Sequence, residues 1–362
     1  MNNSQISTGY VGSSVFKEGR LGDRLTLAPN GDSLWYKANT VPTLDLRFAD
    51  SETLTNQVDN ASPVTFTRAS IGTYVDGSGV IQSAAVDTPR FDHDPATGES
   101  LGLLVEEART NLLLNSATLS TQSATVTATQ HVLSFYGTGT VTLSGASTAG
   151  PLVGTGANDR VDLLFTPSAG SLTLTVTGSV TNAQLETGTF PTSYIPTTTS
   201  TATRAADVVK LTGTNFSSWY NQSAGSVFVE YNKNFTVNWP SYLGLFSVKY
   251  SANQPWNNFI MYGFTNGNGS STAVYWSAKL AGAQQLTYAE YQTNTVGTYS
   301  HAMAISNNDA AFYQNGVQRG VDTSISLPTA DEAVLETVSC RISRIVYWPE
   351  RLPNATLQTL TT

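Results

Sequence analysis

The chain has 362 residues, of which 12% are charged, and its formal net charge at pH 7 is −8. Without a basic stripe to neutralise phosphates, the sequence argues against binding to nucleic acid and to anionic membranes. No window of about 20 apolar residues occurs, and residues 1–14 have neither a basic nor an apolar signal region. We therefore expect no membrane insertion and no conventional export signal.

The composition predicts the fold class. Ser, Thr, Asn, Gly, Val and Tyr are abundant, whereas lysine is scarce and the Ala/Glu/Lys/Leu runs of amphipathic helices are missing. The length exceeds what one hydrophobic core usually organises. We predict an all-β protein with two β-sandwich (jelly-roll) domains in tandem and an extended N-terminal arm.

The cysteine content indicates the compartment in which the protein folds. The single cysteine, Cys340, excludes an internal disulfide, and its neighbours VSCRISRIVYW predict a buried strand position. A polar, hydroxyl-rich chain without disulfides suits a protein that folds in a cytoplasm and leaves as part of a particle. This combination favours a virion protein that is assembled in the host cytoplasm.

The first 41 residues are predicted to form a docking arm. They are rich in Gly, Ser and Asn, and their isolated apolar residues cannot form a core alone. Large aromatic side chains in such a segment favour docking on another chain. We expect the arm to bind other virion proteins, of the tail or the capsid, through Phe16, Trp35 and Tyr36.

Residues 42–200 are predicted to form a second unit. The alternation in PTLDLRFAD predicts a half-buried strand, and Asp76-Gly77-Ser78-Gly79 between two β-runs predicts a hairpin. Residues 116–200 are short Thr/Ser/Val alternations separated by Gly, Ser or Pro, which is typical of a small β-sandwich. The hydroxyl-rich residues 197–209 are expected to form a linker.

Residues 201–362 are predicted to form a larger β-sandwich. The density of aromatic residues rises after Val208, and eight β-runs follow, with Asn-Gly turns at 266–267 and 315–316. The tail ERLPNATLQTLTT predicts one short helix after Pro353.

The segment Asp92-His93-Asp94 is the densest cluster of ionisable groups. A histidine between carboxylates can bind a metal or act in acid–base chemistry. Neighbouring residues of an extended segment point to opposite faces, however, and Pro89 and Pro95 flank the cluster. These features favour a polar turn in which Asp caps backbone amides.

Glu106 and Glu107 invite comparison with glycoside hydrolysis, which needs two acids about 5 to 10 Å apart. Strand alternation separates their side chains, which favours a structural role in which Glu107 pairs with Arg109 or Arg90. The sequence contains no Gly-x-Ser-x-Gly elbow, Walker loop or Cys/His metal pattern. We expect no enzyme activity, no cofactor and no metal, although carboxylates from distant strands would leave no sequence signal.

Four aromatic residues are candidates for stacking on glycan rings: Trp256, Tyr262, Tyr275 and Trp276. The Asn-rich loops QPWNN and FTNGNGSS would add amide donors beside them. Core packing or subunit contact is the competing interpretation, since alternation points either Tyr275 or Trp276 outward.

Residues 66–116, FTRASIGTYVDGSGVIQSAAVDTPRFDHDPATGESLGLLVEEARTNLLLNS, resemble a module of tail fibres and appendages of tailed bacteriophages, particularly those that infect cyanobacteria and other aquatic bacteria. In those proteins the module usually precedes a sandwich that ends in AQLE-G-FPTSYIPT, and residues 183–197 here read AQLETGTFPTSYIPT. The resemblance implies that residues 42–200 form one unit similar to a carbohydrate-binding-module β-sandwich.

The late strands of the chain, SHAMAISNNDAAFYQNGVQRGVDTS and ISRIVYWPERLPNATLQTLTT, resemble laminin-G or concanavalin-A-like domains. The family's Asn-Gly hairpin matches Tyr313 to Gly316, and its Leu-x-x-Leu tail matches Leu357 to Leu360. Calcium sites of that family use loop Asp and Asn, but these loops have too few carboxylates for a metal to be assigned.

The leading hypothesis is therefore a non-enzymatic fibre or appendage subunit of a tailed phage. Its arm would dock on the particle, its C-terminal sandwich would contact host cell-surface polysaccharide, and the resemblance implies a homotrimer that gains affinity from avidity. One alternative is a capsid decoration or tail-assembly protein without a ligand. Another is a binding module associated with a polysaccharide depolymerase.

Overall fold

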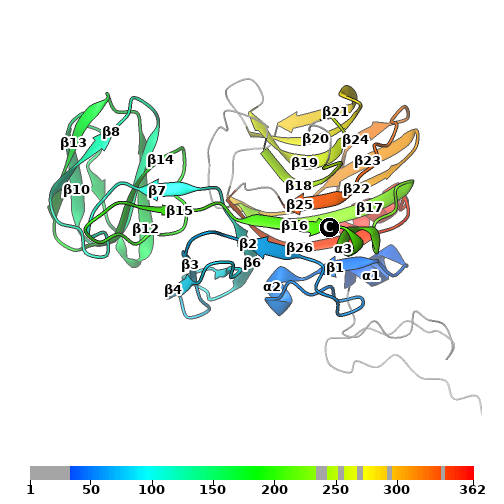
Figure 1. The fold of residues 1–362 in the computed structure, drawn as a ribbon, viewed down its shortest axis with the longest axis horizontal. Helices are drawn as coiled ribbons and strands as arrows, with labels where there is room; N and C mark the ends of the chain where they lie inside the picture. Colours follow the sequence, from blue (N-terminus) through cyan, green and yellow to red (C-terminus); the bar gives the residue numbers. More distant parts are fainter. Residues whose placement is uncertain (1–32, 234–242, 252–256, 267–271, 292–295, 336–338) are drawn as a thin grey trace, which may run out of the picture.

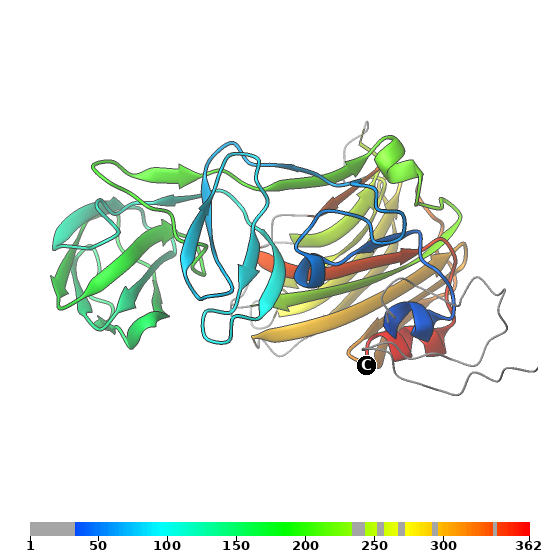
Figure 2. The same cartoon turned by 90° about the horizontal axis from the view of Figure 1, so that it is seen from below.

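The computed structural model describes residues 33–233, 243–251, 257–266, 272–291, 296–335 and 339–362. Most of this part of the chain is β-strand, arranged as a large and a small β-sandwich (Figures 1 and 2). The prediction of an all-β chain with two sandwiches is confirmed. Strand-favouring Val, Thr and aromatic residues account for it, because they pack well on a pleated surface.

The first sheet of the large sandwich has eight strands. In spatial order they are β24 (Val317–Asp322), β23 (Asp309–Gln314), β22 (Gly297–Ser306), β17 (Ala224–Lys233), β26 (Cys340–Trp348), β6 (Ser100–Val105) and β5 (Phe91–His93), with β1 (Leu44–Leu46) also paired to β26. The pairings are antiparallel.

The second sheet of the large sandwich has seven strands. In order they are β2 (Thr65–Thr67), β16 (Val208–Thr212), β25 (Glu332–Leu335), β18 (Leu243–Lys249), β19 (Phe259–Asn266), β20 (Thr272–Leu280) and β21 (Ala283–Tyr291). Alternate residues of both sheets form one core, in which Val227 and Phe312 of the first sheet join Trp276 and Leu335 of the second. Burial of such side chains is the main favourable contribution to folding.

Short helices cover the outer face of the eight-stranded sheet. Helix α1 (Ser33–Ala38) packs against α4 (Asn354–Leu360), and their apolar residues join Phe228 and Trp348 in a separate cluster. Helix α4 begins after Pro353, which confirms the predicted tail helix. Of two four-residue helices, α2 (Phe48–Ser51) lies against β6 and β26 of this sheet, and α3 (Thr214–Ser217) lies against β16 of the other sheet.

The small sandwich has its own core. One sheet has the order β11 (Leu152–Val153), β10 (Thr140–Gly145), β13 (Gly170–Thr177) and β8 (Gln122–Val126). The other has the order β12 (Gly156–Phe165), β9 (His131–Gly137) and β14 (Val180–Thr187). Leu133 and Phe135 face Leu172 and Leu174 between the two sheets, and all four are fully buried.

The small sandwich is inserted into the large one. The chain leaves through β7 (Arg109–Asn111) and returns through β15 (Ala202–Arg204), and these two strands pair with each other. The sheet pairing therefore departs from the expected boundary at residue 200. Strands β1 and β6 pair with β26, and β2 pairs with β16, so segments on both sides of that boundary build the same two sheets.

Two predicted turns join paired strands. Residues 76–79 connect β3 (Gly72–Val75) to β4 (Ile81–Ala84), which confirms that hairpin. Asn315 and Gly316, between β23 and β24, have φ values of 44° and 77°, as a type I′ turn requires. Of the other predicted Asn-Gly turn, residue 267 lies outside the described residues.

The described end of the expected arm is part of the large sandwich. Leu34, Trp35 and Ala38 of α1 are buried against this chain, whereas Tyr36 is 54% exposed. Phe16 lies outside the described residues. Within the described part, no helix has the length and apolarity needed to cross a membrane.

Candidate functional site

Of the four predicted glycan-stacking residues, Trp276 is the one whose side chain the structure describes. Trp276 of β20 has no solvent exposure, and its ring lies 5.5 Å from that of Phe312 in the opposite sheet. It belongs to the core of the large sandwich, so the stacking role expected for Trp276 is not compatible with its position.

The other three candidates are less fully described. Trp256 lies outside the described residues. Tyr262 on β19 is paired with Trp276 in the strand register, and Tyr275 on β20 is paired with Gly263. These backbone positions are described, but the side chains of Tyr262 and Tyr275 are not.

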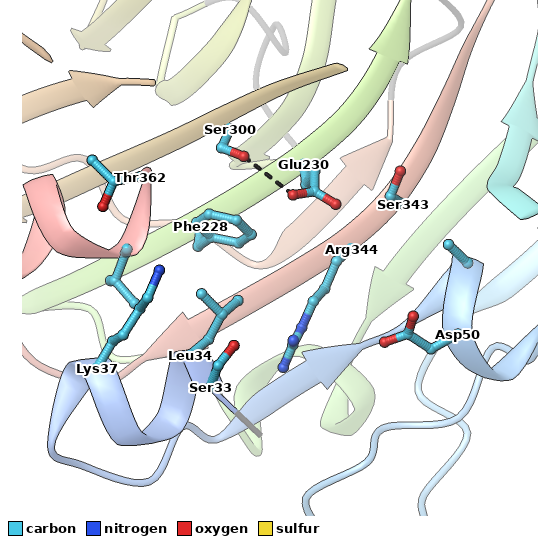
Figure 3. A pocket seen from close by; sticks show the side chains of 12 residues that line it. Ser33, Leu34, Lys37, Asp50, Phe228, Glu230, Ser300, Ser343, Arg344 and Thr362 are labelled. Atoms are coloured by element: carbon cyan, nitrogen blue, oxygen red, sulfur yellow. Dashed lines mark hydrogen bonds between the residues drawn. The ribbon is translucent and has the colours of Figure 1, made fainter. Parts of the chain in front are cut away.

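Sequence reasoning missed a polar groove on the outer face of the large sandwich (Figure 3). Its volume is about 230 Å³. It lies where α1, α2 and the C-terminal residues leave part of the eight-stranded sheet uncovered. Its lining residues are Ser33, Leu34, Lys37, Ala49, Asp50, Phe228, Glu230, Ser300, Ser343, Arg344, Leu360 and Thr362.

The floor of the groove is apolar and its rim is polar. Phe228, Leu34 and Leu360 are buried members of the cluster that α1 and α4 form with the sheet. The half-buried carboxylate of Glu230 rises beside them and accepts a hydrogen bond from Ser300 Oγ at 3.1 Å. Residues i and i+2 of a strand share a face, which explains why Phe228 and Glu230 both point into the groove.

Some charged side chains of the groove are held in ion pairs within the protein, and others remain available to a ligand. Arg344 is held in place by Asp45, with Nε 2.9 Å from Oδ1 and Nη2 2.7 Å from Oδ2. In contrast, no ion pair joins Lys37 or Asp50 to another residue in the described ranges. The groove therefore offers a cation, two carboxylates and several hydroxyls to a small polar ligand, a set of donors and acceptors that suits a polyhydroxylated molecule.

The predicted docking residue Trp35 has a structural partner in its own chain. Its Nε1 donates to Asp45 Oδ2 at 2.9 Å, and Arg47 binds the same carboxylate oxygen at 2.8 Å. Asp45 is fully buried. Of the two predicted docking residues that are described, Tyr36 is the one whose side chain remains available to a partner.

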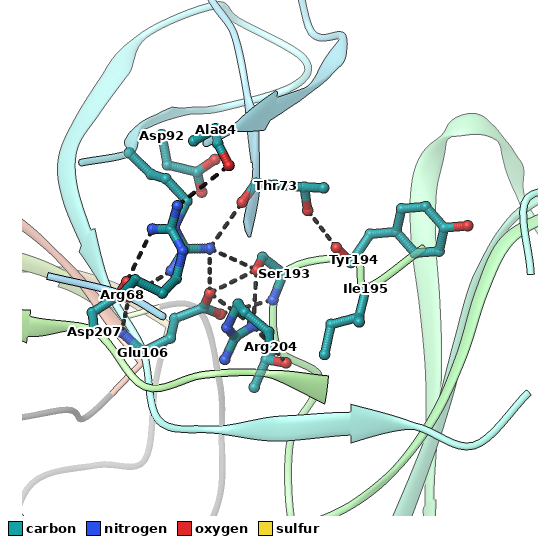
Figure 4. A network of polar contacts seen from close by, with 12 residues as sticks. Arg68, Thr73, Ala84, Asp92, Glu106, Ser193, Tyr194, Ile195, Arg204 and Asp207 are labelled. Atoms are coloured by element: carbon teal, nitrogen blue, oxygen red, sulfur yellow. Dashed lines mark hydrogen bonds and ion pairs between the residues drawn. The ribbon is translucent and has the colours of Figure 1, made fainter. Parts of the chain in front are cut away.

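A second polar centre lies where the small sandwich joins the large one (Figure 4). Arg90 has no solvent exposure, and its Nη1 is 2.7 Å from Glu106 Oε2 while its Nη2 is 2.5 Å from Asp207 Oδ2. Arg68 reaches the other oxygen of Asp207 at 3.1 Å, and Arg204 reaches Glu106 at 3.0 Å. We call these five buried residues the junction network.

Ser193 and Tyr194, which follow the last strand of the inserted sandwich, make hydrogen bonds at or beside the junction network. Ser193 donates to Glu106 through both its backbone N, at 2.7 Å, and its Oγ, at 2.6 Å. Thr73 Oγ1 donates to the carbonyl of the next residue, Tyr194, at 2.5 Å. Contacts between buried charges and hydrogen-bonding groups of this kind fix the relative position of the segments that supply them.

The pKa of Glu106 is shifted in the direction opposite to that which a general acid needs. Burial alone would raise the pKa of Glu106, but Arg204, Arg90 and the hydrogen bonds from Ser193 lower it well below its ordinary value. A catalytic acid of a glycosidase needs a raised pKa. Glu107 pairs with Arg109, which confirms one of the two expected partners. Both residues therefore have structural roles.

The Asp92-His93-Asp94 cluster spans the end of β5 and the start of the turn that follows it. Asp94 Oδ1 accepts hydrogen bonds from Ala96 N and Thr97 N, which lower the pKa of Asp94. Asp92 is buried and lies 2.6 Å from Arg341 Nη2 of β26. His93 Nε2 is 2.9 Å from Glu52 Oε1. In the described ranges, no group of three or more His, Cys, Asp and Glu side chains is arranged to hold a metal ion.

No protein-family model matches the sequence, and no curated protein matches it. Among solved structures, the CBM40 module of a Ruminococcus gnavus IT-sialidase, bound to α2,6-sialyllactose, is 13% identical, covers 39% of this chain and 85% of its own, and has a TM-score of 0.31. A heptameric SAP-like pentraxin from Limulus polyphemus is 13% identical, with coverages of 40% and 73% and a TM-score of 0.29.

Botulinum neurotoxin type C, in a structure titled for its interaction with two ganglioside molecules, is 10% identical. The matched region covers 43% of this chain and 39% of that chain, with a TM-score of 0.34. In all three comparisons the identity and the TM-score are low, so they assign neither a ligand nor an activity to this chain.

Proposed function

We propose that the chain is a non-enzymatic structural subunit of a tailed-phage particle, a fibre or an appendage, that binds saccharides of the host cell surface. Its N-terminal arm attaches to tail or capsid proteins. Its subunits form a homotrimer, so that several weak binding sites act together.

The junction network is the observation that carries the virion part of this proposal. Arg68 lies in FTRAS, Arg90 in TPRF and Glu106 in LLVEEART, all within the block that resembles phage appendage proteins. Ser193 lies in FPTSYIPT, the second matching motif. Sequence motifs that are far apart in the chain thus meet in one buried centre, as expected if the resemblance reflects a shared folding unit.

The groove supports the saccharide part of the proposal. It combines the acceptor Glu230, the donor Lys37 and several hydroxyls above an apolar floor. Its volume of about 230 Å³ is below the roughly 300–1,000 Å³ of pockets for drug-sized ligands, which suits a single sugar ring. Trp276 lies in the core, and the groove is a candidate saccharide site that does not depend on it.

The test combines location and binding. Antibodies against the protein should label intact phage particles, and the purified protein should be retained on host surface polysaccharide. Glu230→Gln should weaken retention about tenfold, because a neutral amide replaces a charged acceptor, whereas Glu99→Gln at an exposed turn should leave it unchanged. Unlabelled particles would overturn the virion role. Tight binding to particles without any saccharide retention would instead identify a decoration or assembly protein.

A further inference from the structure

The outer face of the four-stranded sheet in the small sandwich carries hydroxyl groups in place of charges. On β13, Leu172 and Leu174 point into the core, whereas Ser171, Thr175 and Thr177 are exposed. The outward positions of β8 and β10 are also Ser or Thr. None of the four strands of this sheet contains Asp, Glu, Lys or Arg. We call this surface the hydroxyl face.

The strand register aligns these hydroxyls in rows. Thr142 of β10 lies opposite Thr175 of β13. Ser144 lies opposite Thr173, which in turn lies opposite Ser123 of β8. The hydroxyl oxygens of Ser123 and Thr173 are 3.0 Å apart and share a hydrogen bond. With strands about 4.8 Å apart and same-face residues about 6.8 Å apart, the hydroxyls form a regular two-dimensional array.

The low charge of the whole chain does not explain this array, because charges are present on the other sheet of the same sandwich. Asp159, Arg160 and Asp162 lie on β12. Soluble surfaces ordinarily mix about 25–35% charged residues with polar ones. The two sheets of one small sandwich are thus segregated by charge, and the uncharged sheet is the one that carries the hydroxyl array.

The hydroxyl face also has a defined place in the molecule. Figure 1 shows β10 and β13 at the extreme end of the small sandwich, and both views place α1 and the C-terminus on the large sandwich, away from it. Helix α1 lies within the predicted arm, residues 1–41. If the arm attaches to the particle, as in the proposed function, the hydroxyl face is at the far end from the attachment point.

We infer that the hydroxyl face binds a neutral polysaccharide of the host cell surface. A hydroxyl both donates and accepts hydrogen bonds and rotates to suit its partner, so an array of them matches a polymer of sugar hydroxyls. An anionic polymer would meet no cation here. The choice of host partner rests on the proposed function, whereas the neutral, polyhydroxylated chemistry of the ligand rests on the face itself.

The experiment measures retention of the full chain on immobilised dextran and mannan, which are neutral, and on alginate, which is anionic. The variant Thr175→Glu/Thr177→Glu places two charges on the hydroxyl face, at exposed positions of β13. The control Thr65→Glu/Thr67→Glu makes the same change at two exposed positions of β2 in the large sandwich. Thermal unfolding checks that both variants keep the stability of the parent, and sedimentation follows their oligomeric state.

The inference is supported if the parent binds dextran or mannan, the β13 variant binds at least tenfold more weakly, and the β2 control stays within twofold of the parent. Equal binding by the β13 variant and the parent would overturn it while leaving saccharide binding in place. Binding to alginate alone would overturn the neutral chemistry. A change of oligomeric state confined to the β13 variant would identify a self-association surface instead. If no polymer is bound, the inference fails, while retention on host surface polysaccharide still decides the saccharide part of the proposed function.

Discussion

Arg90 and Asp207 are 117 positions apart in the sequence and form a buried ion pair, with 2.5 Å between Nη2 and Oδ2. Arg90 precedes the small sandwich along the chain, and Asp207 follows it. Their contact therefore ties together the two chain segments that flank the insertion.

Replacing Asp207 by Asn is expected to lower the free energy of unfolding by about 3–5 kcal/mol, because the change leaves buried guanidinium groups without their counter-charge. Urea unfolding followed by tryptophan fluorescence measures the loss. The matched control is Asp309→Asn, whose carboxylate is 54% exposed and pairs with Arg351. That change should cost less than about 1 kcal/mol. Similar losses in both variants would contradict the role of the junction network.

Glu106 should make stability depend on pH in the acid range. Its pKa is lower in the folded protein than the ordinary value of 4.5. Its contribution to stability is therefore present above pH 4.5 and is lost as the pH falls below that value. Urea unfolding at pH 7, 4 and 3 should show the difference between the parent and Glu106→Gln shrinking with acidity. A difference that stays constant across this range would show that Glu106 does not carry the effect.

Cys340 should be inert to thiol reagents in the folded protein. Its side chain is fully buried, and burial raises the pKa of its thiol to about 12. The thiolate is the reactive form. Reaction with Ellman's reagent at pH 8 should be at least a hundredfold slower in buffer than in urea. Comparable rates in the two solvents would show that β26 opens readily.

Trp276→Ala should act on stability and leave saccharide retention unchanged. Removing this buried ring leaves a cavity, at a cost of about 3–5 kcal/mol. The melting temperature should fall, while retention per folded molecule should match that of the parent. A loss of retention without a fall in melting temperature would restore Trp276 to the ligand-binding site.

The small sandwich should fold without the rest of the chain. Its core is separate from that of the large sandwich, and a hydrogen bond from Asn115 N to Thr198 O, 2.7 Å long, joins the two ends of the insertion. A fragment of residues 112–198 should give dispersed amide NMR signals and one cooperative thermal transition. Collapsed signals or gradual unfolding would show that it needs the junction network to fold.

Local sequence patterns predicted the elements whose cause is local. Asp76-Gly77-Ser78-Gly79 predicted the β3–β4 hairpin, and Pro353 marked the start of α4. The alternation in PTLDLRFAD predicted a half-buried strand, but β1 is buried throughout and Phe48–Ser51 form α2. Two strands after residue 316 were missed for opposite reasons. Val317–Asp322 is largely exposed, and Glu332–Leu335 is buried throughout, so neither shows alternation.

The junction network had no local signal because its partners come from distant segments. The pairing of β6 with β26 likewise joins residues that are hundreds of positions apart, and it is the reason that the boundary expected at residue 200 does not separate the sheets. A weak signal was present: Glu106 and Asp207 each lie beside an apolar run in a chain with few charges. Alternation left Tyr275 and Trp276 as equal candidates for the outward position, and the structure shows Trp276 buried against Phe312.

The pairing of β7 with β15 also has a mechanical consequence. A pulling force on the small sandwich is transmitted to the large sandwich through these two strands and through the hydrogen bonds of Ser193 and Tyr194. The ion pairs of the junction network transmit the same force. A force that separates the two sandwiches must therefore break the β7–β15 pairing and buried ion pairs together.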